Sequence, residues 1–363
     1  MVCVSVTNVP RQYVDYSRTP ILNRIQQSET YGSDTIGDTY EAKVILNDLG
    51  DMYTKQKLEQ TPQEAAAWSK EASAPYPPVV LLCEAGLYAL GAWTGIRFYG
   101  MILILACTFL GLSLLYFLHT RWYLFPLLYL NFSYVGYRFV HVQDVSYLVM
   151  LVPIMAALFL ARARLAASHA LMALAITMKL TPLYYAKNVL RMNRGMAVVF
   201  IAILLGGLVL PYFIWDNYAY IFRFGAETRR VQWYETVGAM MVVLPFAVVL
   251  WYIEMRRGMD MEDRLGWDLV PVAMFFAITF NAARHLLIAL LVPDKGGARN
   301  IAAAIALGLH SLFPRFIPFG SLIYVSAAVL VVALIRELEK IGWDTVRDDL
   351  RHPARTARLM LAS

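Results

Sequence analysis

The chain has 363 residues, of which 59% are hydrophobic and only 16% charged, and its mean hydropathy is +0.52. Soluble domains carry about 25% charged residues, so this composition excludes an ordinary soluble protein and predicts an all-α integral membrane protein. The net charge of +6 fits an excess of Lys and Arg in cytoplasmic loops; nucleic-acid binding is not expected, because no basic motif interleaved with aromatic residues occurs.

Residues 1–77 form a polar segment ahead of the apolar part of the chain, without an apolar run long enough to cross a bilayer. A turn punctuated by glycines at 32–37 precedes Asp38, which stands where a helix N-cap is favoured. The proline-rich sequence from Ala74 to Pro78 is expected to be extended, because each proline restricts the residue before it. We therefore expect a hydrophilic N-terminal segment that leads the chain into the membrane.

Residues 78–335 contain a series of apolar runs that predict a polytopic domain of about eight to eleven transmembrane or re-entrant helices. The runs extend over Val79–Trp93, Phe98–Leu118, Trp122–Tyr137, Val145–Leu160, Leu165–Met178, Met196–Trp215, Val237–Ile253, Leu269–Ala283, Leu286–Val292, Ile301–Phe313 and Ile317–Ile335. The first run is expected to be slanted or re-entrant, with both of its ends on the outer side.

The fourth and fifth runs predict a helical hairpin with a basic tip at Arg162 and Arg164. Short loops rich in Lys and Arg stay in the cytoplasm, so the tip is expected on that side. The same side receives the other basic segments, which are Arg121, Lys187–Arg194, Arg256–Arg264, Lys295–Arg299 and the tail 336–363. Within the tail, residues Arg347–Arg358 are expected to form an amphipathic helix on the membrane surface.

This topology leaves Lys179, Arg284, His285 and Gln143 together on the outer side. Ionisable groups at membrane depth are costly, and cations from different helices suit a bound phosphate. The alternatives are a Lys179 or Arg284 side chain that extends to the interface, and a His285 ring that bonds a neighbouring helix. Gln143 can hydrogen-bond a ligand. The three cysteines show no zinc spacing, so no metal is expected.

Acidic and basic residues also occur in the predicted outer loops. Asp38 and Asp34 lie in the N-terminal segment, from which a carboxylate can reach the cations and act as a general base. The alternatives are an N-cap for Asp38 and a solvated loop for Asp34. Arg229 and Arg230 precede Trp233 in another outer loop, where anchoring at the interface competes with binding of an anionic head group.

Several short motifs follow one another in a characteristic order. A Gly37-Asp38 pair comes first, and the sequence Tyr-Pro-Pro follows at 76–78, where Tyr76 is a candidate residue of a substrate loop, with Asp34, Arg229 and Arg230. Gln143 then leads an apolar run, and Lys-Leu-Thr-Pro at 179–182 precedes a basic stretch. This order resembles that of the polytopic glycosyltransferases of the GT-C class. It is most similar to the glycosyltransferase family 87 type, which includes bacterial polyprenol-phosphate-mannose-dependent mannosyltransferases.

The resemblance implies an enzyme that transfers a sugar, mannose or another hexose or pentose, from a polyprenyl-phosphate donor. The acceptor would be a hydroxyl of a glycan or glycolipid on the outer face of the bacterial cytoplasmic membrane, and the anomeric configuration would invert. Asp38 matches the family's catalytic aspartate, with His285 as a second acid or base. Lys179 and Arg284 would hold the leaving phosphate, beside Gln143. No cofactor is expected.

The resemblance also leaves alternatives open. Members of the class carry a transmembrane helix ahead of the aspartate loop, so we expect either a start upstream of Met1 or a relative with another role. A transporter of lipids or lipid-linked sugars would use the same cations without covalent chemistry. A non-catalytic membrane subunit derived from such a transferase would bind the lipid without turning it over.

Overall fold

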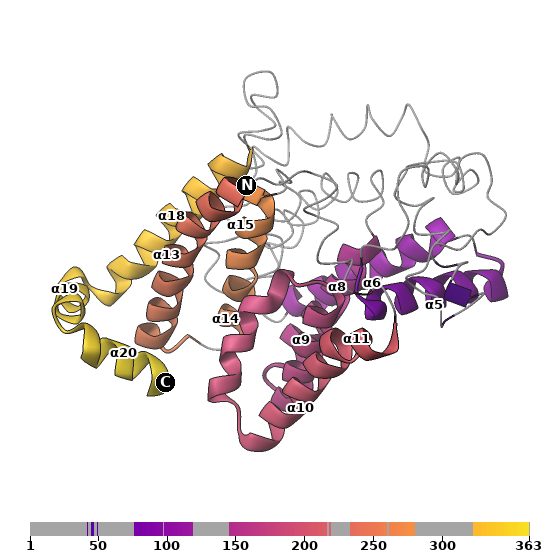
Figure 1. Cartoon of the computed structure of the whole chain (residues 1–363), viewed down its shortest axis with the longest axis horizontal. Helices are drawn as coiled ribbons and strands as arrows, with labels where there is room; N and C mark the ends of the chain where they lie inside the picture. Colours follow the sequence, from indigo (N-terminus) through magenta and orange to yellow (C-terminus); the bar gives the residue numbers. More distant parts are fainter. Residues whose placement is uncertain are drawn as a thin grey trace.

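A computed structural model describes residues 42, 45, 46, 49, 76–96, 98–118, 145–215, 218, 233–259, 261–279 and 322–362. Over these ranges the regular structure is helical, without a strand, as the composition predicted. Figure 1 shows the helices in two groups. One group contains α5, α6 and α8–α11, and the other contains α13, α15 and α18–α20.

In the first group the helices are α5 (Pro78–Thr94), α6 (Phe98–Leu118), α8 (Val145–Leu160), α9 (Leu165–Met178), α10 (Arg194–Leu204) and α11 (Pro211–Ile214). In the second group they are α13 (Trp233–Arg257), α15 (Val270–Thr279), α18 (Leu322–Ile341), α19 (Trp343–Arg351) and α20 (Pro353–Ala362). Between the groups lie a 3₁₀ helix, η1 (Thr181–Arg191), and the short helix α14 (Met261–Asp268). A π-helical turn, η2 (Leu205–Val209), joins α10 to α11.

The predicted helices 98–118, 145–160 and 165–178 match α6, α8 and α9 residue for residue. The other described helices differ from prediction at their ends. Thus α13 continues past its apolar run to Arg257, and α18 continues to Ile341. The predicted helices at Trp122–Tyr137, Leu286–Val292 and Ile301–Phe313 lie outside the described residues.

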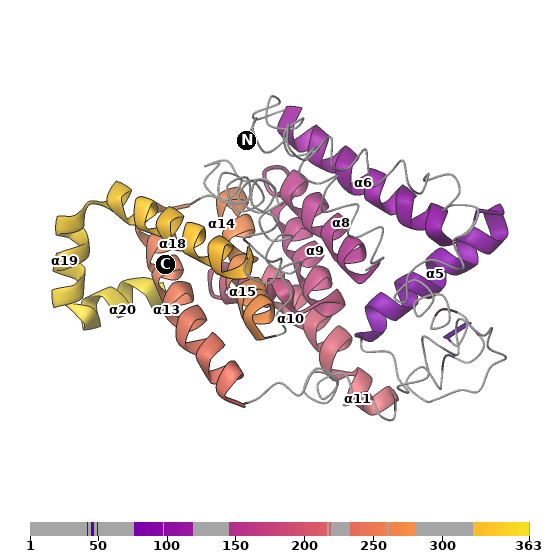
Figure 2. The ribbon, with the colours of Figure 1, turned by 90° about the horizontal axis from the view of Figure 1, so that it is seen from above.

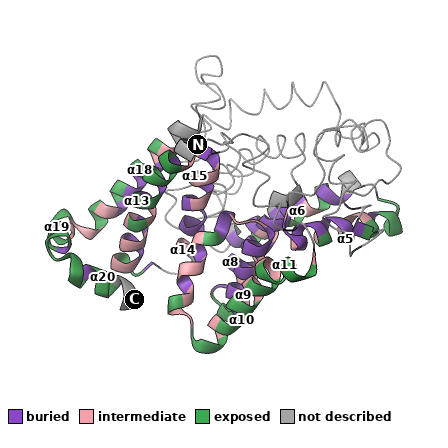
Figure 3. Cartoon of the chain, in the orientation of Figure 1, coloured by how far each residue is buried: buried purple, intermediate pink, exposed green. Residues whose placement is uncertain are grey.

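The hairpin of α8 and α9 forms the centre of the first group. Both helices are largely buried, as Figure 3 shows, and a core of apolar side chains extends from them to α6, α13 and α15. The Ser168 hydroxyl donates a hydrogen bond to the Ala157 carbonyl across the hairpin, at 2.7 Å. A polar side chain that bonds backbone in this way lets the two helices approach closely without leaving a buried hydroxyl unpaired.

The segment after α9 differs from the prediction, which had only a break at Pro182 followed by a basic loop. The chain instead forms η1, eleven residues in 3₁₀ geometry, with Pro182 in its first turn. At about 2 Å per residue this helix covers roughly 22 Å, enough to run back along α9. Asn193 then caps α10, because its side chain accepts a hydrogen bond from the Met196 N–H at 2.9 Å. Because η1 runs back along α9 before α10 begins, α9 and α10 run in the same direction.

The basic residues collect at one end of these helices, which we call the basic end. The hairpin tip (Arg162 and Arg164) and the junction of η1 with α10 lie there. The ends of α13 and α18 meet through an ion pair between Arg257 and Glu337. The prediction of a loop at 256–264 is partly wrong, because α14 begins within this range, at Met261. Leu265 and Trp267 of α14 are buried.

The C-terminal tail is helical, but it is divided where one helix was expected. Helix α19 ends at Arg351 and α20 begins at Pro353. Proline is favoured in the first turn of a helix and disfavours helical geometry in the residue before it, so His352 interrupts the helix. Asp349 of α19 is buried against α13, where the Arg256 guanidinium and the Tyr252 hydroxyl donate to its carboxylate.

Within the part of the chain that the structure describes, two helical stretches are long and apolar enough to cross a membrane, Arg194–Ile214 and Thr236–Arg257. Both expose large apolar side chains: Phe213 is 81% exposed and Met241 73%. Figure 3 shows exposed residues over much of α10 and α11. Shorter apolar helices accompany them, α5 among them, and Figure 2 shows α5 and α6 diverging from a common turn.

Candidate functional site

Lys179 lies at the point where α9 ends. Its N–H donates the last helical hydrogen bond to the Ala175 carbonyl at 3.0 Å, but its own backbone is extended, with φ −154° and ψ 134°. Pro182 follows three residues later, in the first turn of η1, and the chain reverses here. The Lys179 side chain therefore lies at the end of α9 that is opposite to the hairpin tip.

Tyr76 receives this side chain. The Lys179 ammonium nitrogen lies 5.5 Å from the centre of the Tyr76 ring, and both residues are half-buried. A cation within about 6 Å of an aromatic face is attracted by the ring quadrupole. Pro77 and Pro78 hold Tyr76 directly ahead of α5, because Pro78 occupies the first turn of that helix. The sequence motifs Tyr-Pro-Pro and Lys-Leu-Thr-Pro, about 100 residues apart, therefore meet in space.

The N-terminal segment packs beside this contact. Ile45 forms a small apolar cluster with Leu81 and Ala85 of α5 and with Tyr218, and Tyr76 packs against the cluster. The Trp215 indole N–H donates to the Leu49 carbonyl at 2.8 Å. We call this region, Tyr76 and Lys179 with the cluster around Ile45, the Lys179 end. It contains Ile45 and the Leu49 carbonyl, which follow Asp38 in sequence by 7 and 11 residues.

Most of the predicted site lies outside the described residues. The structure brings together Tyr76 and Lys179. The other predicted site residues lie outside the described residues; they are Asp34, Asp38, Gln143, Arg229, Arg230, Arg284 and His285. Helix α15 begins shortly after Asp268, which contacts Lys187, and ends at Thr279.

A second polar centre lies nearer the basic end, and the sequence did not predict it. Lys187 of η1 contacts two fully buried carboxylates, Glu254 of α13 at 3.0 Å and Asp268 of α14. The Asn188 amide donates to Asp268 at 2.7 Å, and the Lys187 ammonium lies 4.1 Å from the centre of the Tyr184 ring. We call these residues the Lys187 cluster.

Hydrogen bonds tie η1 to the neighbouring helices on both sides of the Lys187 cluster. The Tyr184 hydroxyl donates to the Ala247 carbonyl of α13 at 2.6 Å. The Tyr185 hydroxyl and the His169 Nδ1 atom of α9 are 2.8 Å apart. Successive side chains of a 3₁₀ helix align every third residue, so Tyr184 and Lys187 form one row and Tyr185 and Asn188 another. The cluster therefore joins the two helix groups.

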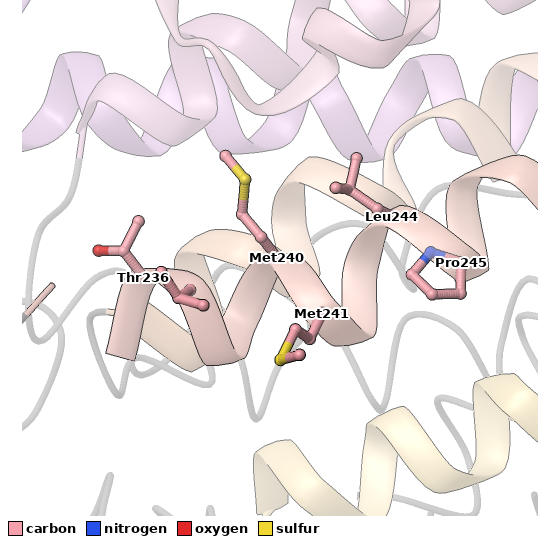
Figure 4. Close-up of a pocket in the computed structure, with 6 residues that line it drawn as sticks. Thr236, Met240, Met241, Leu244 and Pro245 are labelled. Atoms are coloured by element: carbon pink, nitrogen blue, oxygen red, sulfur yellow. The ribbon is translucent and has the colours of Figure 1, made fainter. Parts of the chain in front are cut away.

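An apolar hollow lies on the first half of α13, away from the basic end. Its lining residues are Thr236, Val237, Met240, Met241, Leu244 and Pro245. Figure 4 shows Met240 and Leu244 projecting from one side of the helix and Met241 from another. The lining contains no ionisable group, so the hollow can hold an apolar chain but supplies no acid, base or phosphate ligand.

Among the described residues, no group of three or more His, Cys, Asp or Glu side chains is arranged to hold a metal ion. At the Lys179 end, the ammonium group of a half-buried lysine lies over the Tyr76 ring. The sequence has no match among known protein families, curated proteins or solved structures.

Proposed function

We propose that this protein is a membrane glycosyltransferase of GT-C type, and that it transfers a sugar from a polyprenyl phosphate to an acceptor hydroxyl on the outer face of the bacterial cytoplasmic membrane. The observation that carries the proposal is the contact of Lys179 with Tyr76, beside which the N-terminal segment packs. Two described stretches are long and apolar enough to span a membrane, which is consistent with the proposal. The basic end, which lies opposite to the Lys179 end, is consistent with it as well.

In the proposed reaction the acceptor oxygen forms a bond to the anomeric carbon while the bond from that carbon to the phosphate oxygen breaks. The Asp38 carboxylate takes the acceptor proton. The polyprenyl phosphate leaves with the electron pair of the broken bond, and the Lys179 ammonium stabilises the charge that grows on it. Attack from the face opposite to the leaving group inverts the anomeric centre. Arg284 and His285 would complete the phosphate site, and Gln143 would orient the donor.

The apolar character of the chain suits the rest of such a donor. A prenyl chain needs a hydrophobic path beside the phosphate site, and the exposed faces of α10, α11 and α13 supply apolar surface. The acceptor is expected to approach from the aqueous side of the Lys179 end, where Ile45 and Leu49 lie. These apolar surfaces fit a lipid-linked donor better than a soluble nucleotide sugar, which carries no hydrocarbon chain.

The proposal is tested by transfer of labelled sugar from polyprenyl-phosphate mannose, and from the corresponding pentose donor, to membrane glycolipid. Wild-type protein in lipid nanodiscs should transfer the label, and Asp38→Ala should lose at least 100-fold in rate, as loss of a general base predicts. Asp48→Ala, in the same N-terminal segment but outside the predicted site, is the matched control. Equal turnover by the Asp38 and Asp48 variants would remove Asp38 from the role. Movement of the lipid across liposomes without acceptor would instead identify a transporter.

A further inference from the structure

The π-helical turn η2, which follows α10, packs against the last turn of α9. Gly207 lies within this turn, and a Cβ atom added to it would stand 2.4 Å from Cγ2 and 2.5 Å from Cβ of Thr177. Carbon atoms in contact prefer about 3.5–4.0 Å, so no side chain fits there unless the helices separate. The adjacent Gly206 has nothing within 4 Å of the same added atom. The close approach is thus specific to Gly207.

Thr177 cannot turn away easily from this contact. It is fully buried, and its hydroxyl donates to the Leu174 carbonyl at 2.7 Å. It belongs to the last turn of α9, two residues before Lys179, whose N–H is bonded to the Ala175 carbonyl. A displacement of Thr177 is therefore passed on to Lys179 through a single helical turn.

We propose that Gly207 is a positioning residue that fixes the end of α9, and with it the Lys179 ammonium, in register with Tyr76. The inference rests on the proposed role of Lys179 in holding the donor phosphate. A π-helical turn inserts one extra residue into a helix and is frequent at functional sites. In this protein the π-helical turn places Gly207 against Thr177. An added methyl group would separate the helices by about 1 Å, a misplacement that can cost on the order of 100-fold in an oriented site.

The test is a titration with undecaprenyl phosphate, followed by native mass spectrometry of the full-length protein in nanodiscs. Wild type and Gly206→Ala should bind it equally. Gly207→Ala should bind at least tenfold more weakly, approaching Lys179→Ala. Equal affinity of the Gly207 and Gly206 variants, while Lys179→Ala loses binding, would overturn the positioning role and leave the proposed function intact. Equal affinity of wild type and Lys179→Ala would instead refute the phosphate site, and the positioning role with it.

A second variant separates positioning from simple loss of packing. Thr177→Gly removes both carbon atoms that the new methyl group would meet, so Gly207→Ala combined with Thr177→Gly should recover most of the affinity. Thr177→Ser should not rescue, because its Cβ atom remains. Thermal unfolding of each variant is followed in parallel. A Gly207→Ala protein that melts earlier but binds like wild type would show that the contact is only structural.

Discussion

Two lysines eight residues apart have different surroundings in this chain. Lys179 is half-buried on an aromatic ring, whereas Lys187 is 10% exposed and contacts two buried carboxylates. The sequence singled out Lys179, because it directly follows an apolar run, and assigned Lys187 to a basic loop. The signal for the second site was present in Glu254, a carboxylate at the end of an apolar helix. Its lysine partner is 67 residues away, and sequence spacing alone does not reveal such a pairing.

Replacing Lys187 by Met should destabilise the protein strongly. The substitution preserves much of the volume but leaves Glu254 and Asp268 buried without their cation, which costs about 3–5 kcal/mol in comparable pairs. Lys340→Met is the control, because Lys340 is 52% exposed and pairs with Glu337 within one helix. Glu337 is buried but keeps its ion pair with Arg257, so loss of the exposed Lys340 ammonium should cost no more than about 1 kcal/mol. The midpoint of thermal unfolding in detergent is measured for both variants. Similar midpoints would contradict the stabilising role that we assign to Lys187.

Asp349 should make the stability depend on acid pH. Burial acts to raise its pKa, but hydrogen bonds from Arg256 and Tyr252 and the Arg256 charge outweigh burial and hold the pKa below its ordinary value. A carboxyl with a lower pKa in the folded state stabilises the fold above its unfolded pKa, about 3.9, and the contribution disappears as pH falls through the folded pKa.

We expect Asp349→Asn to lower the unfolding free energy by about 1–3 kcal/mol at neutral pH, as for hydrogen bonds to charged groups. The difference from wild type should shrink below about pH 4. Thermal midpoints measured from neutral to acid pH test this. Asp344→Asn is the control, because that side chain is fully exposed and its ion pair with Arg347 is long, 3.7 Å. A difference between wild type and Asp349→Asn that is unchanged in acid would contradict the account.

At the level of elements, uninterrupted apolar runs were predictable and irregular helices were not. The bounds of α6, α8 and α9 follow from where apolar residues begin and end. Helix η1 was missed because its residues align every third position, Tyr184 with Lys187 for example, and a search for the α-helical period does not detect that row. Helix α14 was missed because it is short and half polar, and only its packed face, with Leu265 and Trp267, distinguishes it from a loop.

The turn between α5 and α6 depends on a glycine. Gly95 has a φ of +71°, a left-handed conformation that other residues adopt at a cost of roughly 1 kcal/mol. Gly95→Ala should therefore lower the stability by about that amount. Gly86→Ala, inside α5 with free space around an added methyl group, should be neutral or stabilising. Thermal midpoints of the two variants give the comparison, and a Gly95 variant as stable as the Gly86 variant would contradict the assigned turn.

For the whole molecule, the sequence did not predict what joins the two helix groups. Basic residues of the hairpin tip, of the junction of η1 with α10 and of the ends of α13 and α18 lie at one end of the described helices, and their cytoplasmic location stays a prediction. The junction of the two helix groups is formed by η1 and the Lys187 cluster. Likewise, the packing of Ile45 and Leu49 against α5 and Trp215 joins positions far apart in sequence. Such contacts depend on tertiary packing, which a local pattern does not encode.

The most direct measurement is mass spectrometry of the lipids that co-purify with the protein in mild detergent, for wild type and Lys179→Ala. The account predicts polyprenyl phosphate, with or without a hexose or pentose, in the wild type and its loss in the variant, because the cation at the end of α9 holds the phosphate. The mass of the bound lipid would also identify the sugar class. Only bulk phospholipid in both samples would contradict the account and leave the contact of Lys179 with Tyr76 a structural one.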